Sequence, residues 1–288
     1  MVKLSIIMPA YNESATIVHA IAQVLRVDYP CPVELIVVND GSSDGTAELL
    51  EAYGDRDVLV VNHPRNLGKG AAVRTGVARS TGTHMIIFDA DLEYAPSDIP
   101  AMLQHVLDGR ADHVFGARVF GFNTRYPSFR FATGGRLLTL AANLLFDSCL
   151  TDMHTCLKLV PIGDFEALRL TESGFGLDTE LTARLIRGGV RPYEVPISYN
   201  GRSFQEGKKI SWSDGLRCLA ILTKVRAERV PQALPARPAV RVPFPAEYLL
   251  PVPATATNRD SRRASGLHAE IPVRPVGEAD SNDAAVAM

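Results

Sequence analysis

This sequence of 288 residues contains few cysteines and has almost no excess of charge of either sign. Its four cysteines (Cys31, Cys149, Cys156 and Cys218) lie far apart, without CxxC or Cys/His spacing, which argues against a zinc site or a redox pair. The 30 Lys and Arg nearly balance the 32 Asp and Glu, giving a net charge of -2, so no general basic field favours a nucleic acid. These features predict a protein of the reducing cytoplasm with no nucleic-acid partner.

Long apolar runs are also missing. A transmembrane helix needs about 18 or more apolar residues in succession, and the best candidate, LLTLAANLLF at residues 137–146, is too short. The apolar stretch near the first Met is too short for a signal-peptide core. We therefore expect neither a membrane span nor a secretion signal.

Short β-branched runs alternate with amphipathic segments over the first 120 residues or so. Continuous apolar strands separated by helical segments predict an α/β fold, with a mostly parallel sheet covered by helices on both faces. Such sheets bind ligands at the carboxyl ends of their strands. The expected strands are 4–8, 33–38, 58–61, 85–88 and 113–117, and the expected helices are 15–25, 46–53, 69–79 and 99–107.

The composition changes near residue 226. Nine of the nineteen prolines fall between Pro231 and Pro275, among Ala, Ser and scattered Arg. Such a segment buries too little apolar surface to offset the entropy of ordering. We expect one folded domain, 1–226, and a disordered tail, 227–288, which could recruit a separate membrane protein.

Polar residues follow the first two predicted strands, in PAYNE (9–13) and NDGSSDGT (39–46). Taken in isolation, the segments have two interpretations of equal weight, and the second one gains because both loops open at the same edge of the sheet. Turn chemistry and a helix cap account for both segments. Alternatively, Tyr11 and Glu13 border a planar base and a ribose, while Asp40 accepts a hydrogen bond from the base.

Three carboxylates, Asp89, Asp91 and Glu93, gather directly after the fourth strand. Like charges held close raise one another's pKa unless a cation neutralises them. Oxygen ligands suit Mg²⁺ or Mn²⁺, which bridge diphosphate oxygens. The spacing therefore favours a divalent-ion site over an ordinary loop.

Taken together, PAYNE (9–13), DGSSDGT (40–46), NLGKG (66–70) and DAD (89–91) resemble glycosyltransferase family 2, which has the GT-A nucleotide-diphospho-sugar fold. Over residues 3–225 the chain is most similar to the branch of dolichol-phosphate mannose synthases and polyprenyl-phosphate glycosyltransferases. The resemblance implies a donor site with a metal at Asp89 and Asp91. Glu93 departs from the Gln common in that branch and adds a third anionic ligand to the metal site. The implied nucleotide-binding residues are Pro9, Tyr11, Glu13, Asp40, Lys69 and Ala90.

Lys69 belongs to a Gly-Lys-Gly turn that opens a helix, where a cation and free N–H groups attract an anion. A purely structural turn explains the two glycines equally well. The segment is not a P-loop, because the GxxxxGK[ST] spacing is missing.

Three motifs further along resemble acceptor-side elements of this branch: GAR (116–118), TDMHTCLK (151–158) and YNGRSFQEGKKI (199–210). The implied catalytic residues are Asp89, Asp91, Asp152, Arg118 and Arg202, and the implied acceptor- or phosphate-binding residues are Arg118, Arg202, Lys208 and Lys209. We interpret His154 and Cys156 as packing residues. Glu180 either pairs with Arg184 one helical turn away or, with Asp178, lines the acceptor cleft.

The resemblance implies an inverting transfer of a hexosyl group from a nucleotide diphosphate sugar, of the GDP-mannose or UDP-glucose type, to a polyprenyl or dolichyl phosphate. A phosphomonoester is mostly a dianion at pH 7, so this acceptor needs no strong general base. Two alternatives are a soluble or polysaccharide hydroxyl acceptor, with Asp152 or Asp178 as base, and a catalytically silent nucleotide-sugar binding protein.

A lipid acceptor requires contact with the inner face of the cell membrane. Segment 210–225 combines apolar residues with Arg217 and Lys224, which is consistent with a helix that rests on lipid headgroups. The apolar segment 137–146 is a second candidate for such a helix. Packing against the protein's own sheet explains both segments at least as well.

Overall fold

The computed structural model describes every residue except 52, 54–57, 203–211, 229–233 and 235–288. The described part belongs to one compact unit, Met1–Val242. Lys208, Lys209 and nearly all of the predicted tail lie outside the described residues.

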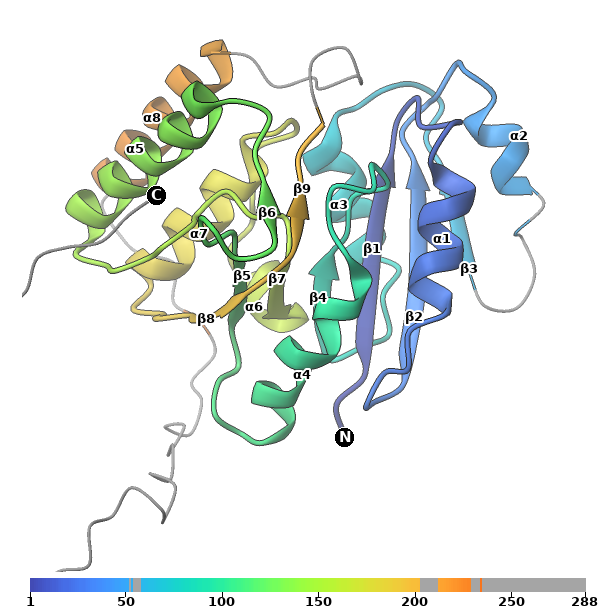
Figure 1. The fold of residues 1–288 in the computed structure, drawn as a ribbon, viewed down its shortest axis with the longest axis horizontal. Coiled ribbons are helices and arrows are strands. Elements are labelled where there is room, and N and C mark those ends of the chain that lie inside the picture. The colour runs from blue at the N-terminus through green and yellow to red at the C-terminus, as the bar shows by residue number, and fades with distance from the viewer. Residues whose placement is uncertain (52, 54–57, 203–211, 229–233, 235–288) are drawn as a thin grey trace, which may run out of the picture. The chain divides into compact units, whose positions relative to one another are not determined.

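A seven-stranded sheet forms the centre of this unit, in the order β3-β2-β1-β4-β7-β5-β8 (Figure 1). All neighbouring strands are parallel except β7, which is antiparallel to β4 and β5. The predicted α/β fold with a mostly parallel sheet is confirmed. The strands are β1 (Leu4–Ala10), β2 (Val33–Asn39), β3 (Val58–Asn62), β4 (His84–Ile87), β5 (Val114–Ala117), β7 (Lys158–Pro161) and β8 (Tyr193–Pro196).

Side chains alternate between two cores across the sheet. In β1, Leu4, Ile6 and Met8 pack into one core, and Ile7 packs into the other. Helices α1 and α4 cover the first face, and α3, α6 and α7 cover the second (Figure 1). The helices of these layers are α1 (Ile17–Leu25), α2 (Thr46–Glu51), α3 (Lys69–Val77), α4 (Ile99–Leu107, after the 3₁₀ turn Pro96–Asp98), α6 (Ile162–Ala167) and α7 (Leu177–Arg187).

Two further helices, α5 (Phe129–Phe146) and α8 (Trp212–Ala227), lie side by side against α7 (Figure 1). Their inner faces share a third core that includes Phe146 and Leu222. Both helices also leave leucines exposed. On α5 these are Leu137, Leu140 and Leu144, and on α8 they are Leu216 and Leu219.

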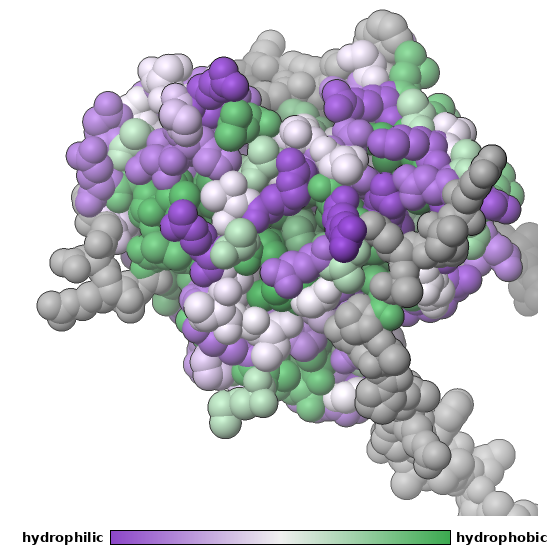
Figure 2. Space-filling view, turned by 180° about the vertical axis from the view of Figure 1, so that it is seen from behind, coloured by the Kyte–Doolittle hydropathy of each residue, from purple (hydrophilic) through white to green (hydrophobic). Residues whose placement is uncertain are grey.

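A small parallel pair, β6 (Thr124–Arg125) and β9 (Tyr199–Asn200), joins the start of α5 to the segment before α8. On the face seen in Figure 2, hydrophobic patches are interrupted by hydrophilic side chains. Within the described ranges, none of the helices has the length and apolarity that a bilayer crossing needs.

Candidate active site

Hydrogen bonds join the loops that follow β1 and β2. The Asn12 N–H donates to Ser42 Oγ at 3.0 Å, and the Ser43 N–H donates to Asn12 Oδ1 at 2.9 Å. The Glu13 N–H donates to Thr46 Oγ1 at 3.0 Å. Pro9 is buried near the end of β1, and Tyr11 is half-buried just beyond it. The two polar loops therefore lie at one edge of the sheet, as parallel strands require.

Asp40 is buried and holds the next loop in place. Its Oδ1 accepts from His63 Nδ1 at 2.7 Å and from the Leu67 N–H at 2.9 Å. Its Oδ2 accepts from the Gly68 N–H at 2.7 Å. The carboxylate thus fixes the turn that leads into Lys69, while its predicted contact with a base stays a prediction.

Lys69 begins α3 and reaches into the carboxylate cluster. Its Nζ lies 2.8 Å from Asp89 Oδ2, 3.4 Å from Asp178 Oδ2 and 3.2 Å from Cys156 Sγ. Burial disfavours its charge, but the negative charges around it, with Asp89 foremost, raise its pKa well above the ordinary value. The Cys156 thiol donates to Asp89 Oδ2 at 2.8 Å, so Cys156 belongs to the site as well as to the core.

The predicted metal carboxylates share an excess of negative charge. Burial, together with the charges of Asp89 and Glu93, raises the pKa of Asp91 to about 7. Over the described ranges, no three His, Cys, Asp or Glu side chains form a complete metal site by themselves. The all-oxygen set of Asp89 and Asp91 therefore fits a hard divalent ion that takes further oxygens from a diphosphate. Ala90 is buried between the two aspartates.

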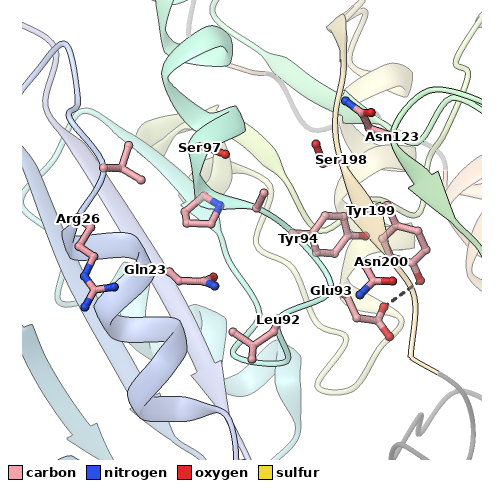
Figure 3. Close-up of a pocket in the computed structure, with 13 residues that line it drawn as sticks. Gln23, Arg26, Leu92, Glu93, Tyr94, Ser97, Asn123, Ser198, Tyr199 and Asn200 are labelled. Atoms are coloured by element: carbon pink, nitrogen blue, oxygen red, sulfur yellow. Dashed lines mark hydrogen bonds between the residues drawn. The ribbon is translucent and has the colours of Figure 1, made fainter.

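Both carboxylate oxygens of Glu93 have partners in the segment that follows β8, which includes β9. Tyr199 Oη donates to Oε2 at 2.8 Å (Figure 3), and the Arg202 N–H donates to Oε1 at 2.8 Å. Glu93, Tyr94 and Tyr199 also separate a shallow cavity of about 440 Å³ from the larger cavity of the site. A role of Glu93 as a third metal ligand stays a prediction, and Tyr199 is a site residue that the sequence did not single out.

Arg202 joins the nucleotide loop to the metal loop. Its guanidinium lies 3.3 Å from Glu13 Oε2, 3.3 Å from Asp91 Oδ2 and 3.8 Å from Glu93 Oε1. Arg202 therefore lies beside the predicted metal carboxylates, while its contact with phosphate stays a prediction.

Arg118 and Asp152 form a close ion pair on the other side of the site. Arg118 Nε lies 2.6 Å from Asp152 Oδ2, and Nη2 lies 2.9 Å from Oδ1. Burial opposes ionisation of Asp152, but the charge and hydrogen bonds of Arg118 prevail and lower its pKa to about 2. The guanidinium also lies 4.9 Å from the ring centroid of Tyr199.

Asp178 is a second paired acid. It lies between Lys69 and Lys158, each 3.4 Å away, and these cations outweigh burial and lower its pKa. Glu180 instead pairs with Arg184 at 2.9 Å and accepts from the N–H groups of residues 171 and 172. Of the two acids, only Asp178 lines the larger cavity. The interpretation of Glu180 as a helix ion pair is therefore the one that the geometry favours.

His154 lies near Asp178, and its imidazole ring is neutral. Burial and the charge of Lys158 lower the pKa of His154 to about 4. Its Nε2 lies 3.4 Å from Thr179 Oγ1. His154 also lines the larger cavity, so its interpretation as a packing residue stays a prediction.

A cavity of about 920 Å³ connects the carboxylates to α5 and α8. At one end lie Lys69, Asp89 and Asp91, and towards the other end the wall becomes largely apolar, with Leu137 and Leu216 among its residues. Two arginines of α5, Arg130 and Arg136, also line it. Neither was predicted from the sequence to belong to the site, although two arginines shortly before the apolar segment 137–146 were a usable signal.

Arg136 stacks 5.2 Å from the ring centroid of Phe120. Neither arginine forms an ion pair with an acid in the described ranges. Both are therefore placed to meet an anion that enters the cavity.

A parallel sheet that carries nucleotide-type loops, paired aspartates and basic residues at one edge defines a nucleotide-sugar transferase fold. The family model for glycosyl transferase family 2 matches residues 5–157. Because this match covers more than half of the chain, the protein belongs to that family.

Two relatives extend the comparison. Glycosyltransferase AglJ of Haloferax volcanii is 28% identical over 198 residues, covering 68% of this chain and 63% of the relative. An undecaprenyl-phosphate 4-deoxy-4-formamido-L-arabinose transferase of Pseudomonas paraeruginosa is 35% identical over 114 residues, covering 37% of this chain and 33% of the relative. The chain thus spans less than two thirds of either relative. Its relatives include a polyprenyl-phosphate sugar transferase, in agreement with the branch that the motifs predicted.

A solved structure supports the fold. Glucosyl-3-phosphoglycerate synthase of Mycobacterium tuberculosis, in complex with Mn²⁺, uridine diphosphate and glucosyl-3-phosphoglycerate, superposes with a TM-score of 0.58 at 21% identity. The match covers 78% of this chain and 80% of the synthase. At this identity the likeness establishes the fold alone, and it confirms the predicted GT-A architecture.

Proposed function

We propose that this glycosyltransferase moves a hexosyl group from a nucleotide diphosphate sugar to the phosphate of a polyprenyl lipid at a membrane surface. The observation that carries the proposal is the state of the two acids on the acceptor side. Asp152 and Asp178 are both held in ion pairs that lower their pKa. A hydroxyl acceptor needs a base to take its proton, and these paired acids are poor bases. A phosphate acceptor is already ionised at pH 7.

The donor end supplies charge for the departing diphosphate. A Mg²⁺ or Mn²⁺ ion held by Asp89 and Asp91, in the predicted arrangement that also includes Glu93, stabilises that charge when bound. Lys69 adds a buried cation beside Asp89. Pro9, Tyr11 and Glu13 are proposed to border the nucleotide, in the loops that Asp40 helps to fix. The transfer is proposed to invert the anomeric carbon, and NMR of the product tests that outcome directly.

The acceptor end supplies a path for a lipid phosphate. Arg130 and Arg136 line the cavity together with apolar side chains of α5 and α8. Beyond the cavity, exposed leucines continue on α5, with 52% of the surface of Leu140 and 77% of that of Leu144 accessible. A polyprenyl phosphate has an anionic phosphate followed by an apolar isoprenoid chain. It therefore matches a path on which basic side chains are followed by apolar ones. Contact with the cytoplasmic face of the membrane, and any separate membrane protein partner, are part of this proposal.

A radiolabel assay tests the function. The full chain is incubated with Mn²⁺ and labelled GDP-mannose or UDP-glucose, with polyprenyl phosphate or with the unphosphorylated polyprenol as a matched control. We expect label in the organic phase only with the phosphate, and its loss in the Asp89→Asn, Asp91→Asn double variant. Transfer to an aqueous glycan would favour the hydroxyl-acceptor alternative. Nucleotide-sugar binding without any transfer would favour a silent binding protein.

A further inference from the structure

Arg202 is shared by carboxylates that belong to two different loops. Its Nη1 lies 3.3 Å from Glu13 Oε2, its Nη2 lies 3.3 Å from Asp91 Oδ2, and its Nε lies 3.8 Å from Glu93 Oε1. Glu13 follows β1, whereas Asp91 and Glu93 follow β4. One guanidinium therefore offsets part of the negative charge where the nucleotide loop meets the metal loop.

These contacts are long for an arginine. Charge-assisted N–H···O bonds are usually about 2.7–2.9 Å, as in the Arg118–Asp152 pair at 2.6 and 2.9 Å. Arg202 Nε is buried and has no hydrogen-bond acceptor among the described residues. The side chain is held by the summed charge of its neighbours more than by directed bonds, so another cation can replace it at small cost in hydrogen bonding.

We propose that Arg202 is a resident counter-ion of the donor site, which leaves Asp91 and Glu13 when a divalent ion binds. The inference rests on the proposed function, because it takes Asp91 as a metal ligand. Without any cation, the buried carboxylates repel one another. With the ion and the guanidinium both present, two positive charges compete for the same oxygens.

The exchange has a consequence for catalysis. A guanidinium released from Asp91 remains beside the donor end of the cavity, because the Arg202 N–H is anchored to Glu93 Oε1 at 2.8 Å. It is then available to phosphate oxygens, for which arginine has a suitable fork of donors. Arg202 thus pairs with the carboxylates before the donor binds and with phosphate oxygens afterwards.

Titration of the full chain with Mn²⁺ alone, followed by calorimetry or by the electron paramagnetic resonance of free Mn²⁺, tests the competition. We expect Arg202→Gln to bind Mn²⁺ about fivefold more tightly than the wild type, because a competing charge has been removed. Arg202→Lys keeps the charge and should stay near the wild type. Arg217→Gln is the matched control, since Arg217 is exposed on α8 and pairs with Glu172 outside the cavity wall. Circular dichroism checks that each variant folds.

A second measurement needs no variant and separates displacement from a general change in charge. Mg²⁺ is added to wild-type chain labelled with ¹⁵N-arginine, and the Nε–Hε signals are followed by NMR. The Arg202 signal should move while that of Arg217 stays. An unmoved Arg202 signal, or equal Mn²⁺ affinities in the wild type and Arg202→Gln, overturns the inference.

The control for the proposed metal site is Asp91→Asn. If that variant loses Mn²⁺ affinity while Arg202→Gln matches the wild type, the metal site stands and only the exchange is wrong. If neither the wild type nor Arg202→Gln binds Mn²⁺, with or without GDP or UDP, the metal site and the exchange are both wrong.

Discussion

Arg118 and Asp152 meet in a bidentate pair, with Nε 2.6 Å from Oδ2 and Nη2 2.9 Å from Oδ1. The pair joins the end of β5 to the segment before β7. Because β7 runs against its neighbours, that segment arrives at the same edge of the sheet as the carboxyl ends of β1, β2 and β4. A single antiparallel strand therefore brings Asp152 to the edge of the sheet at which the site lies, where its charge holds Arg118.

Replacing Asp152 with Asn should destabilise the chain by about 3 kcal/mol at pH 7, since it leaves the buried Arg118 without a counter-charge. The pKa of Asp152 is lowered to about 2 in the folded chain from about 3.9 when unfolded. Its stabilising effect is therefore present above pH 4 and is lost as the pH falls towards 2. Urea unfolding of both proteins should show their difference shrinking over that window. A difference that stays constant from pH 7 to pH 2 contradicts the pairing.

The effect of Asp91 on the pH dependence of stability has the opposite sign to that of Asp152. The folded pKa of Asp91 is raised to about 7, so the metal-free chain loses stability as the pH rises from about 4 through 7. We expect Asp91→Asn to be more stable than the wild type by about 2–4 kcal/mol at pH 8 with a chelator present. Near pH 4 the two should be alike. Asp108→Asn, at an exposed carboxylate after α4, is the control and should show no such gain; a wild type as stable as Asp91→Asn at pH 8 would refute the charge excess.

The alternation of apolar and amphipathic segments predicted the parallel core and the edge at which the site lies. It did not predict β7, because Lys158 begins that strand and is wholly buried, a position that composition assigns to the surface. The motifs predicted which loops carry chemistry. The pairing of Asp40 with His63 and of Arg202 with Glu13 depends on long-range contacts, 23 and 189 residues apart in the chain, which no local spacing encodes.

Lys69 and Lys158 flank the same acid, Asp178, but only Lys69 lines the cavity. We expect Lys69→Met to lower kcat/KM about 100-fold, as loss of one charge-stabilising group at a reaction centre commonly does. Lys158→Met removes a more deeply buried cation from Asp178 and should lower Tm with a much smaller effect on kcat/KM. Initial rates and thermal unfolding of both variants make the comparison. Equal losses of rate would mean that Lys69 acts through stability alone.

Substitution of the exposed leucines of α5 tests whether this face of the helix contacts a membrane or only water. Leu140 and Leu144 have 52% and 77% of their surface accessible, although α5 buries its other face in the third core. Each leucine that enters a lipid interface contributes about 1.5–3 kcal/mol. We therefore expect the double variant Leu140→Asp, Leu144→Asp to reduce co-sedimentation with anionic liposomes at least about tenfold.

Leu59→Asp is the matched control, because it also replaces an exposed leucine with a charge. Leu59 is 45% exposed and lies on β3, the edge strand opposite β8. This variant should sediment like the wild type. Liposomes that contain polyprenyl phosphate distinguish a general lipid contact from binding of the acceptor, since Arg130 and Arg136 line the cavity whereas Leu140 and Leu144 do not. If the double variant of α5 still sediments like the wild type, these helices do not contact the membrane, and the lipid phosphate must reach Arg130 and Arg136 from another side.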